Sequence, residues 1–178
     1  MGTDKSRIPV DGVPSAVRIA RLLAQVVGPV IEVGPGCSGL PAVLEADRYQ
    51  GPLAAVAAGS DELRRRGHHG PALVLACDLP RVGLRLLRYL AAWPGAGSVV
   101  PVVEGRDQYL CARFGTAALD AAPGLVAVGA RKVRVALDAG PVARPGPDEW
   151  ARVAGAAEFI DVDEPADLIR AGLAGELG

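Results

Sequence analysis

The sequence predicts an α/β fold, a three-layer sandwich with a mostly parallel sheet. Short β-branched apolar runs bounded by Gly or Pro alternate with longer segments of helical spacing, the order typical of βαβ units. The apolar runs lack the in–out alternation of a half-exposed strand, which indicates strands covered on both faces. A chain of 178 residues is long enough for one core without a metal or disulfide, so we expect one domain over residues 1–178.

Five strands are predicted from the apolar runs, at residues 29–34, 72–77, 98–103, 108–114 and 158–162. The third and fourth runs are joined by only four residues, which is short enough for a β-hairpin. We therefore expect one antiparallel strand in an otherwise parallel sheet.

Four helices are predicted from apolar spacing, at residues 17–27, 51–66, 83–92 and 164–173. The second is opened by Gly51-Pro52, which places proline at the favoured first helical position. Residues 139–149 are rich in Gly and Pro, and we expect them to form a loop on the surface of the domain.

Composition and charge narrow the function classes. Apolar residues make up 50% and charged residues 22%, which excludes a disordered chain. The 19 basic and 20 acidic residues give a net charge of −1, which argues against binding to nucleic acid or a membrane surface. Three widely spaced cysteines form neither a disulfide framework nor a zinc motif, and no signal peptide opens the chain. We therefore expect a soluble, cytoplasmic protein.

Asp78 is the first candidate site residue, because it follows a buried strand directly. In open α/β sheets ligands bind beyond the carboxyl ends of the strands. A carboxylate there can hold a hard cation such as Mg²⁺ together with water and phosphate oxygens. Asp is also a preferred N-cap, and a helix is predicted a few residues later, so Asp78 taken alone favours capping.

Asp161 and Asp163 follow the last predicted strand and form the second candidate. Their i, i+2 spacing places both side chains on one side of an extended segment. They could share a magnesium ion with Asp78 if the two strand ends are neighbours. The alternative is again capping, because Asp163 precedes Glu164-Pro165, and we expect one ligand and one cap.

Two further candidates could contact a nucleotide or its phosphates. Asp47 and the turn before Pro52 place polar groups and a glycine ahead of a helix N-terminus, where anions bind readily. Lys5 lies beside a small-residue turn and could bind phosphate as a point charge, although a lysine near a terminus is commonly only solvated. P-loop, zincin and hydrolase motifs (Walker A, HExxH, GxSxG) are absent from the sequence.

Taken in order, these segments resemble the molybdenum cofactor guanylyltransferase family over nearly the whole chain. The more specific motifs are LVLACDLP at 73–80 and VVPVVEGRDQYLCARF at 99–114. The others are MGTDK at 1–5, IPVDG at 8–12, ADRYQGPLAAVAAG at 46–59 and FIDVDEPADL at 159–168. The resemblance implies a Rossmann-like nucleotidyltransferase sandwich with Mg²⁺ as its cofactor.

The resemblance also implies roles for individual residues. Asp78 would bind the magnesium ion, and Lys5 would contact the triphosphate. The nucleotide site would be lined by Asp47, Gly51, Pro52 and Leu53. Contacts to the acceptor or to a second metal would come from Gln108, Asp161 and Asp163.

The implied reaction moves GMP from GTP, or CMP from CTP, to molybdopterin or a similar phosphorylated acceptor and releases pyrophosphate. Two alternatives stay open. One is a nucleotidyltransferase for another acceptor, such as a sugar phosphate or phospholactate. The other is a catalytically inactive homologue that binds a nucleotide or a protein partner.

The N-terminus departs from the family pattern. The family opens with a strand and a glycine-rich loop, roughly L-A-G-G-x-S-x-R-M-G, and this chain begins at the final Met-Gly. A start site placed at an internal methionine is the explanation we favour, and a shortened homologue is the other. Loss of a central strand leaves unpaired main-chain groups on its neighbours, so we expect low solubility or self-association through the exposed sheet edge.

Overall fold

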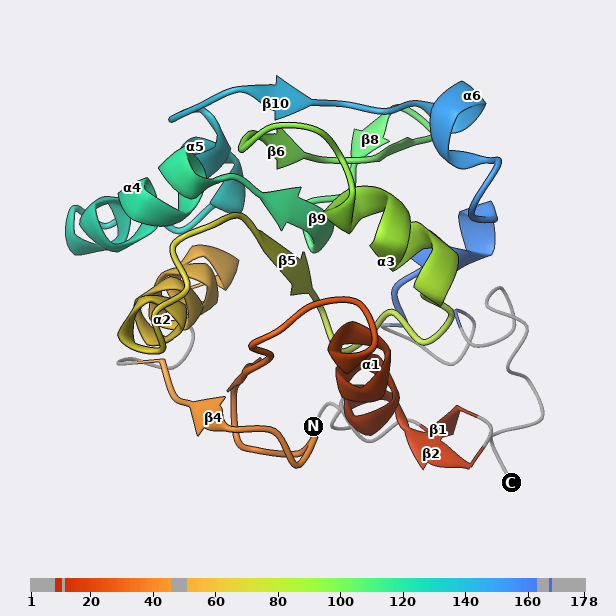
Figure 1. Ribbon diagram of the computed structural model, residues 1–178, viewed down its shortest axis with the longest axis horizontal. Coiled ribbons are helices and arrows are strands. Elements are labelled where there is room, and N and C mark those ends of the chain that lie inside the picture. The colour runs from red at the N-terminus through yellow and green to blue at the C-terminus, as the bar shows by residue number, and fades with distance from the viewer. Residues whose placement is uncertain (1–8, 11, 46–50, 163–166, 168–178) are drawn as a thin grey trace.

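The computed structural model describes residues 9–10, 12–45, 51–162 and 167. Helices cover both faces of a central sheet, which gives the three layers expected from the sequence (Figure 1). Helices α2 (Pro52–Arg65), α4 (Thr116–Ala127) and α5 (Val133–Leu137) form one outer layer, and α1 (Ser15–Ala24) and α3 (Leu84–Ala91) form the other. In the described part of the chain, no helix has the length and apolarity needed to cross a membrane.

The central sheet has four strands in the order β10-β6-β9-β5, with bounds Val142–Ala143, Ser98–Val99, Cys111–Phe114 and Ala72–Leu75. Strand β10 is parallel to β6, whereas β9 is antiparallel to both β6 and β5. Three strands therefore share one direction and β9 opposes them. The expected antiparallel strand in an otherwise parallel sheet is confirmed.

Three smaller strand pairs accompany the sheet. They are β1 (Pro9–Val10) with β2 (Val13–Pro14), β3 (Glu32–Val33) with β4 (Ala42–Val43), and β7 (Val102–Val103) with β8 (Arg106–Asp107). The predicted hairpin between the runs at 98–103 and 108–114 is seen in the antiparallel pairing of β6 with β9, but its loop is tighter than predicted. Strand β8 lies inside the predicted connection and pairs with β7, and the two loop residues Glu104 and Gly105 have φ of 49° and 75°. A two-residue hairpin loop favours positive φ at both positions, because its twist then matches that of the strands.

Two apolar clusters hold the layers together. Ala112 and Phe114 of β9 face the α2, α4 and α5 layer, and Cys111 faces the α1 and α3 layer. On that second face Leu86, Leu87 and Leu90 of α3 are each 0% exposed. Complete burial of a leucine side chain stabilises a fold by about 1.5–3 kcal/mol, so α3 is strongly anchored by one face.

Two predicted segments differ from the structure. Residues 158–162 are not a strand, because a 3-10 helix, η2 (Ala156–Phe159), occupies the start of that run. The Glu158 carboxylate explains the change: it accepts hydrogen bonds from the N–H groups of Gly155 and Gly83, which holds the segment in a turn.

The predicted loop at 139–149 is also wrong, because it contains β10 and the short helix α6 (Pro147–Trp150). Main-chain bonds from Ser98 N to Pro141 O and from Val100 N to Ala143 O, each 2.9 Å, hold β10 at the edge of the sheet. Helices α4 and α5 were not expected from the sequence. The predicted helix at 164–173 falls outside the described residues except for Asp167.

Candidate functional site

Asp78 lies in the turn that follows β5. Beyond the paired residues of β5 and β9, a main-chain bond runs from Ala76 N to Leu110 O at 2.9 Å. The chain then turns at Cys77 and Asp78. The side chain of Asp78 is half-buried. The structure therefore places this carboxylate at the carboxyl end of a central strand, where ligands of open α/β sheets bind.

The interpretation of Asp78 as the N-cap of the next helix is wrong. Helix α3 begins at Leu84, and its N-cap is Gly83. The Gly83 N–H donates to Glu158 Oε2 at 2.7 Å, so a carboxylate from η2 satisfies this end of the helix. Asp78 is thus not required for capping α3.

The structure brings the segment that carries Asp161 against the turn that carries Asp78. Val162 N donates to Asp78 O at 3.0 Å, so the segment after η2 lies against the turn after β5. The Val162 side chain is buried and anchors this segment, while the neighbouring Asp161 is exposed. Asp163 lies outside the described residues, as do Lys5 and Asp47.

Gln108 lies at the same end of the sheet. Because β9 is antiparallel to β5, the start of β9 is next to the end of β5. Main-chain bonds from Gln108 N to Pro101 O and from Cys111 N to Gln108 O fix its position, and Gln108 Nε2 donates to Arg106 O at 3.3 Å. Burial, and then a hydrogen bond to Asp107, raise the pKa of the neighbouring Tyr109.

The turn at the start of α2 has a different character. Gly51 is the N-cap with φ of 87°, and Pro52 is the exposed first residue of the helix. Leu53 is 0% exposed in the core, and its N–H donates to Arg131 O at 3.3 Å. In this arrangement Leu53 offers neither its side chain nor its N–H to a ligand, so it acts as a packing residue.

The sequence reasoning missed the two basic residues beside this turn. Arg131 lies directly against Gly51, and Lys132 follows it as the N-cap of α5; both are exposed. A positive charge next to a helix N-terminus favours anionic ligands. The adjacent Arg-Lys pair was the available signal, but nothing in the sequence shows that this loop returns to residue 51.

The donor set suits magnesium better than a transition metal. In the described part of the chain, no group of three or more His, Cys, Asp or Glu side chains could hold a metal ion on its own. Mg²⁺ does not require such a cage, because it is commonly held by one or two carboxylates, several waters and substrate phosphates. The carboxylates of Asp78 and Asp161, on two hydrogen-bonded segments, fit that chemistry.

Histidine and cysteine side chains offer no competing centre here. His68 Nε2 is 3.0 Å from Pro71 O and so serves the turn before β5. Burial, with a smaller contribution from the charge of Glu158, raises the pKa of Cys111 to about 12. A thiol with that pKa is not a nucleophile near neutral pH, because the thiolate is the reactive form.

Comparison with known proteins decides the family. The MobA-like NTP transferase domain matches residues 1–142. The chain belongs to this family. It is 31% identical to a probable molybdenum cofactor guanylyltransferase of Chloroflexus aggregans over 94% of this chain and 85% of the relative. It is 32% identical to the molybdenum cofactor guanylyltransferase of Rhodobacter capsulatus over 96% and 87%.

Solved structures share the fold at low sequence identity. Molybdopterin-guanine dinucleotide biosynthesis protein A from Archaeoglobus fulgidus superimposes with a TM-score of 0.73 at 20% identity, covering 99% of this chain and 93% of the other. A putative protein from Aquifex aeolicus gives a TM-score of 0.66 at 15% identity, covering 84% and 79%. The predicted three-layer nucleotidyltransferase fold and the predicted enzyme class are confirmed: the chain is a nucleotidyltransferase.

Proposed function

We propose that this MobA-like nucleotidyltransferase transfers GMP from GTP to the terminal phosphate of molybdopterin in molybdenum cofactor biosynthesis. The observation that carries the proposal is the bond from Val162 N to Asp78 O, which brings two acidic segments together at the end of β5. Two relatives that are 31% and 32% identical, each aligned over most of its length, carry the guanylyltransferase name.

The reaction is an in-line displacement at the α-phosphorus of GTP. An oxygen of the acceptor phosphate forms the new bond, and the bond from the α-phosphorus to the bridging oxygen of the β-phosphate breaks. Pyrophosphate leaves with that electron pair. The acceptor phosphate already carries the needed negative charge near pH 7, so no protein group has to remove a proton.

The chain's contribution is positional and electrostatic. Asp78 and Asp161 would hold Mg²⁺, which when bound neutralises charge on the α-phosphate and the leaving group. The exposed Arg131 and Lys132, beside Gly51 and Pro52, would attract the nucleotide to the start of α2. Lys5, Asp47 and Asp163 keep the triphosphate, nucleotide and acceptor roles predicted for them, and Gln108 at the same sheet end keeps its acceptor role.

Location and assembly are part of the proposal. The three cysteines of the chain are all free, and Cys77 is exposed, which suits the reducing cytoplasm. Self-association through the exposed edge of the sheet at β5 remains a prediction.

A pyrophosphate-release assay with Mg²⁺ and molybdopterin tests the activity, with GTP, CTP and ATP compared in parallel. We expect turnover with GTP and none without Mg²⁺ or the acceptor. Preference for CTP would identify a cytidylyltransferase instead, and turnover only with a sugar phosphate or phospholactate would change the acceptor. Nucleotide binding without release of pyrophosphate under all these conditions would support the inactive-homologue alternative and overturn the proposal.

A further inference from the structure

A groove of about 360 Å³ lies beside β5. Strands β3 and β5 both line it without pairing with each other, and helices α1 and α2 supply further lining. In the sheet as described, β5 is the last strand on this side. The hydrogen-bonding directions of the two strands show what the groove can accept.

The outer edge of β5 points into this groove. Ala76 N bonds to Leu110 O of the β9 strand, and residues of an antiparallel strand alternate between groups that face the partner and groups that face away. The register therefore turns the N–H and C=O of Leu73 and Leu75 away from β9. Cys77 continues this alternation, and its carbonyl accepts a 2.7 Å hydrogen bond from Ser15 Oγ of α1.

Strand β3 presents a second edge to the same groove. Glu32 N bonds to Pro41 O and Gly34 N bonds to Val43 O, both at 2.9 Å, so these residues face β4. The alternation turns the main-chain groups of Ile31 and Val33 to the opposite side. Ile31, Val33, Leu73 and Leu75 all line the groove. Two strands thus present outward-facing main-chain groups to one space.

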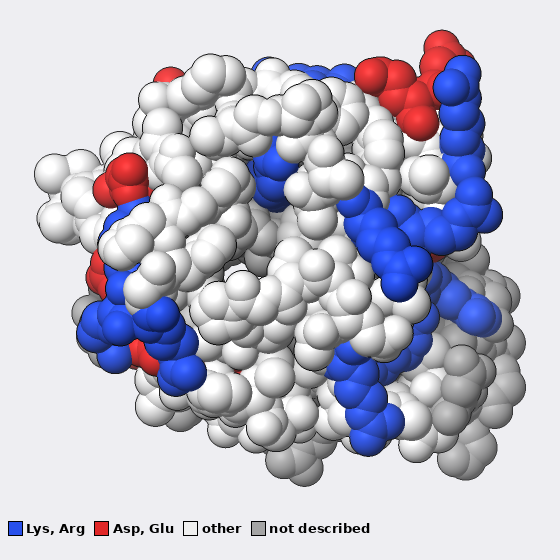
Figure 2. Space-filling view, viewed as in Figure 1, with Lys and Arg blue, Asp and Glu red and all other residues white. Residues whose placement is uncertain are grey.

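The walls are apolar and lined by small side chains. Ala16 and Ala20 of α1 and Ala55 and Gly59 of α2 border the groove, which leaves room for side chains of an occupant. The four residues of β5 are only half-buried, whereas the four of β9 are all buried. Figure 2 shows the middle of the face seen in Figure 1 as largely uncharged, apart from some Lys or Arg atoms in a hollow near its centre.

We propose that this groove binds one extended, apolar peptide strand, which pairs with β3 on one side and β5 on the other. Pairing on both sides joins the two-stranded and four-stranded sheets into one. A strand in this position is covered by helices on both faces, so its side chains are apolar throughout, with no polar face. The proposal is independent of the transferase reaction, because it rests on the β3 and β5 edges alone.

A second copy of the chain fits this space less well than a lone strand. Edge-to-edge pairing of two β5 strands would bring the helices that flank each strand into the same region. The groove is closed by β3 opposite β5 and by α1 and α2, so an occupant enters without helices of its own. This geometry favours a single segment of β-strand over the predicted self-association.

Amide hydrogen exchange followed by NMR tests the proposal. The probe is the synthetic peptide acetyl-Lys-Val-Ile-Val-Val-Ile-Lys-amide, whose terminal lysines keep it soluble. We expect saturating peptide to slow exchange at Leu73, Leu75 and Val33 by at least about tenfold, because their N–H groups gain partners. The Val74 amide, which already faces β9, serves as the internal reference. A peptide N-methylated at alternate residues has the same side chains and should not protect these amides.

A matched pair of variants locates the binding. Ala55→Phe fills the groove, whereas Ala58→Phe changes the same helix at a half-buried residue outside the lining. We expect A55F to weaken peptide binding at least tenfold and A58F to leave it unchanged. Equal binding by both variants, or no slowing of exchange in the parent chain, would overturn the proposal. Concentration-dependent protection of the same amides without peptide, with dimers in sedimentation, would show that a second copy occupies the edge instead.

Discussion

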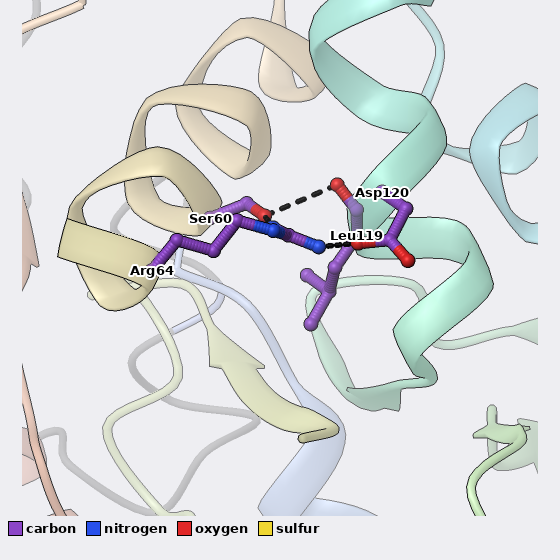
Figure 3. Close-up of polar contacts among 4 residues, drawn as sticks. All are labelled: Ser60, Arg64, Leu119 and Asp120. Carbon is purple, nitrogen blue, oxygen red and sulfur yellow. Dashed lines mark hydrogen bonds and ion pairs between the residues drawn. The ribbon is translucent and has the colours of Figure 1, made fainter. Parts of the chain in front are cut away.

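Ser60 of α2 donates its hydroxyl hydrogen bond to the main-chain carbonyl of Leu119 of α4, at 3.1 Å (Figure 3). Leu119 would normally bond to the N–H of residue 123, but that residue is Pro123 and has no N–H. Ser60 is 2% exposed, so water does not reach the Leu119 carbonyl as an alternative donor. A side chain of α2 thus satisfies the carbonyl that a proline leaves open in α4.

Ser60→Ala should lower the free energy of unfolding by about 1–3 kcal/mol, because it leaves the Leu119 carbonyl buried without this donor. The same change in a Pro123→Ala background should cost less than half as much, since Ala at 123 restores the intrahelical N–H. Urea unfolding of the four proteins gives the coupling energy. Additive effects would show that Ser60 and Pro123 act independently.

The ion pair of Arg64 with the exposed Asp120, also in Figure 3, should contribute under about 1 kcal/mol to the free energy of unfolding.

Asp78→Asn should abolish Mg²⁺-dependent pyrophosphate release while leaving the melting temperature close to that of the parent chain. The amide has similar size but lacks the charge that holds a divalent cation. Asp61→Asn, an exposed change on α2, is the matched control and should retain full activity. Turnover retained in D78N would remove Asp78 from the metal site.

Much of the fold was predictable because apolar runs mark buried strands and amphipathic helices. The four-residue β9 strand lies within the predicted run at 108–114, and α3 differs by one residue at each end from the predicted 83–92. β10 could not be predicted, since its position depends on main-chain bonds to β6 rather than on composition. Helix α4 was missed because Pro123 opposes helix formation, and the donor that compensates lies on another helix.

The candidate site was predictable only where a strand end fixes a position. Asp78 follows β5 as expected, and the segment of Asp161 does lie beside it. The predicted strand at 158–162 was wrong, however, because the 3-10 helix η2 and not a strand precedes Asp161. The cap of α3 comes from Glu158, 75 residues away, and local sequence carries no signal of such a contact. Leu53 was misjudged because a residue after a turn can face inward.

Gly51→Ala should destabilise the fold more than Gly129→Ala. Both glycines have similar positive φ, 87° and 86°, so both variants carry the same backbone strain, of order 1 kcal/mol. A Cβ at 51 would also lie 3.0 Å from Arg131 O, whereas a Cβ at 129 meets nothing within 4 Å. The difference in urea midpoint between the two variants measures the contact with Arg131. Equal midpoints would show that this loop moves aside without cost.

Glu32 should make stability depend on pH in the acid range. Burial by itself raises the pKa of its carboxyl. Hydrogen bonds from Ser38 Oγ and from the N–H groups of Ser38, Cys37 and Gly36 together lower the pKa by more than burial raises it, so the net pKa is lowered. A lowered folded pKa gives stability that is present above the unfolded value, about 4.3, and is lost as pH falls through the folded value.

Glu32→Gln removes that titration and is the control for it. The parent chain should therefore lose more free energy of unfolding than E32Q as the pH is lowered from 6 to 3 in urea titrations. At pH 6 the parent should be the more stable of the two, because the amide cannot accept all four bonds with the strength of a carboxylate. Parallel pH profiles for the two proteins would assign the acid sensitivity to other carboxylates.

Arg113 of β9 should be one of the most sensitive positions in the chain. The residue is 5% exposed, and its guanidinium donates to the carbonyls of Trp93, Gly95 and Gly97 at 2.6–3.2 Å, which ties the turn after α3 to the sheet. Burial lowers its pKa, but an arginine remains charged in proteins. Arg113→Met keeps the length and removes all these donors, so it should cost at least about 3 kcal/mol. The free energy of unfolding of Arg113→Lys should lie between those of the parent chain and of R113M, because one ammonium group cannot reach three carbonyls as the guanidinium fork does. Urea unfolding measures these free energies. Equal values for R113M and R113K would show that this position contributes packing of the side-chain stem and not hydrogen bonds.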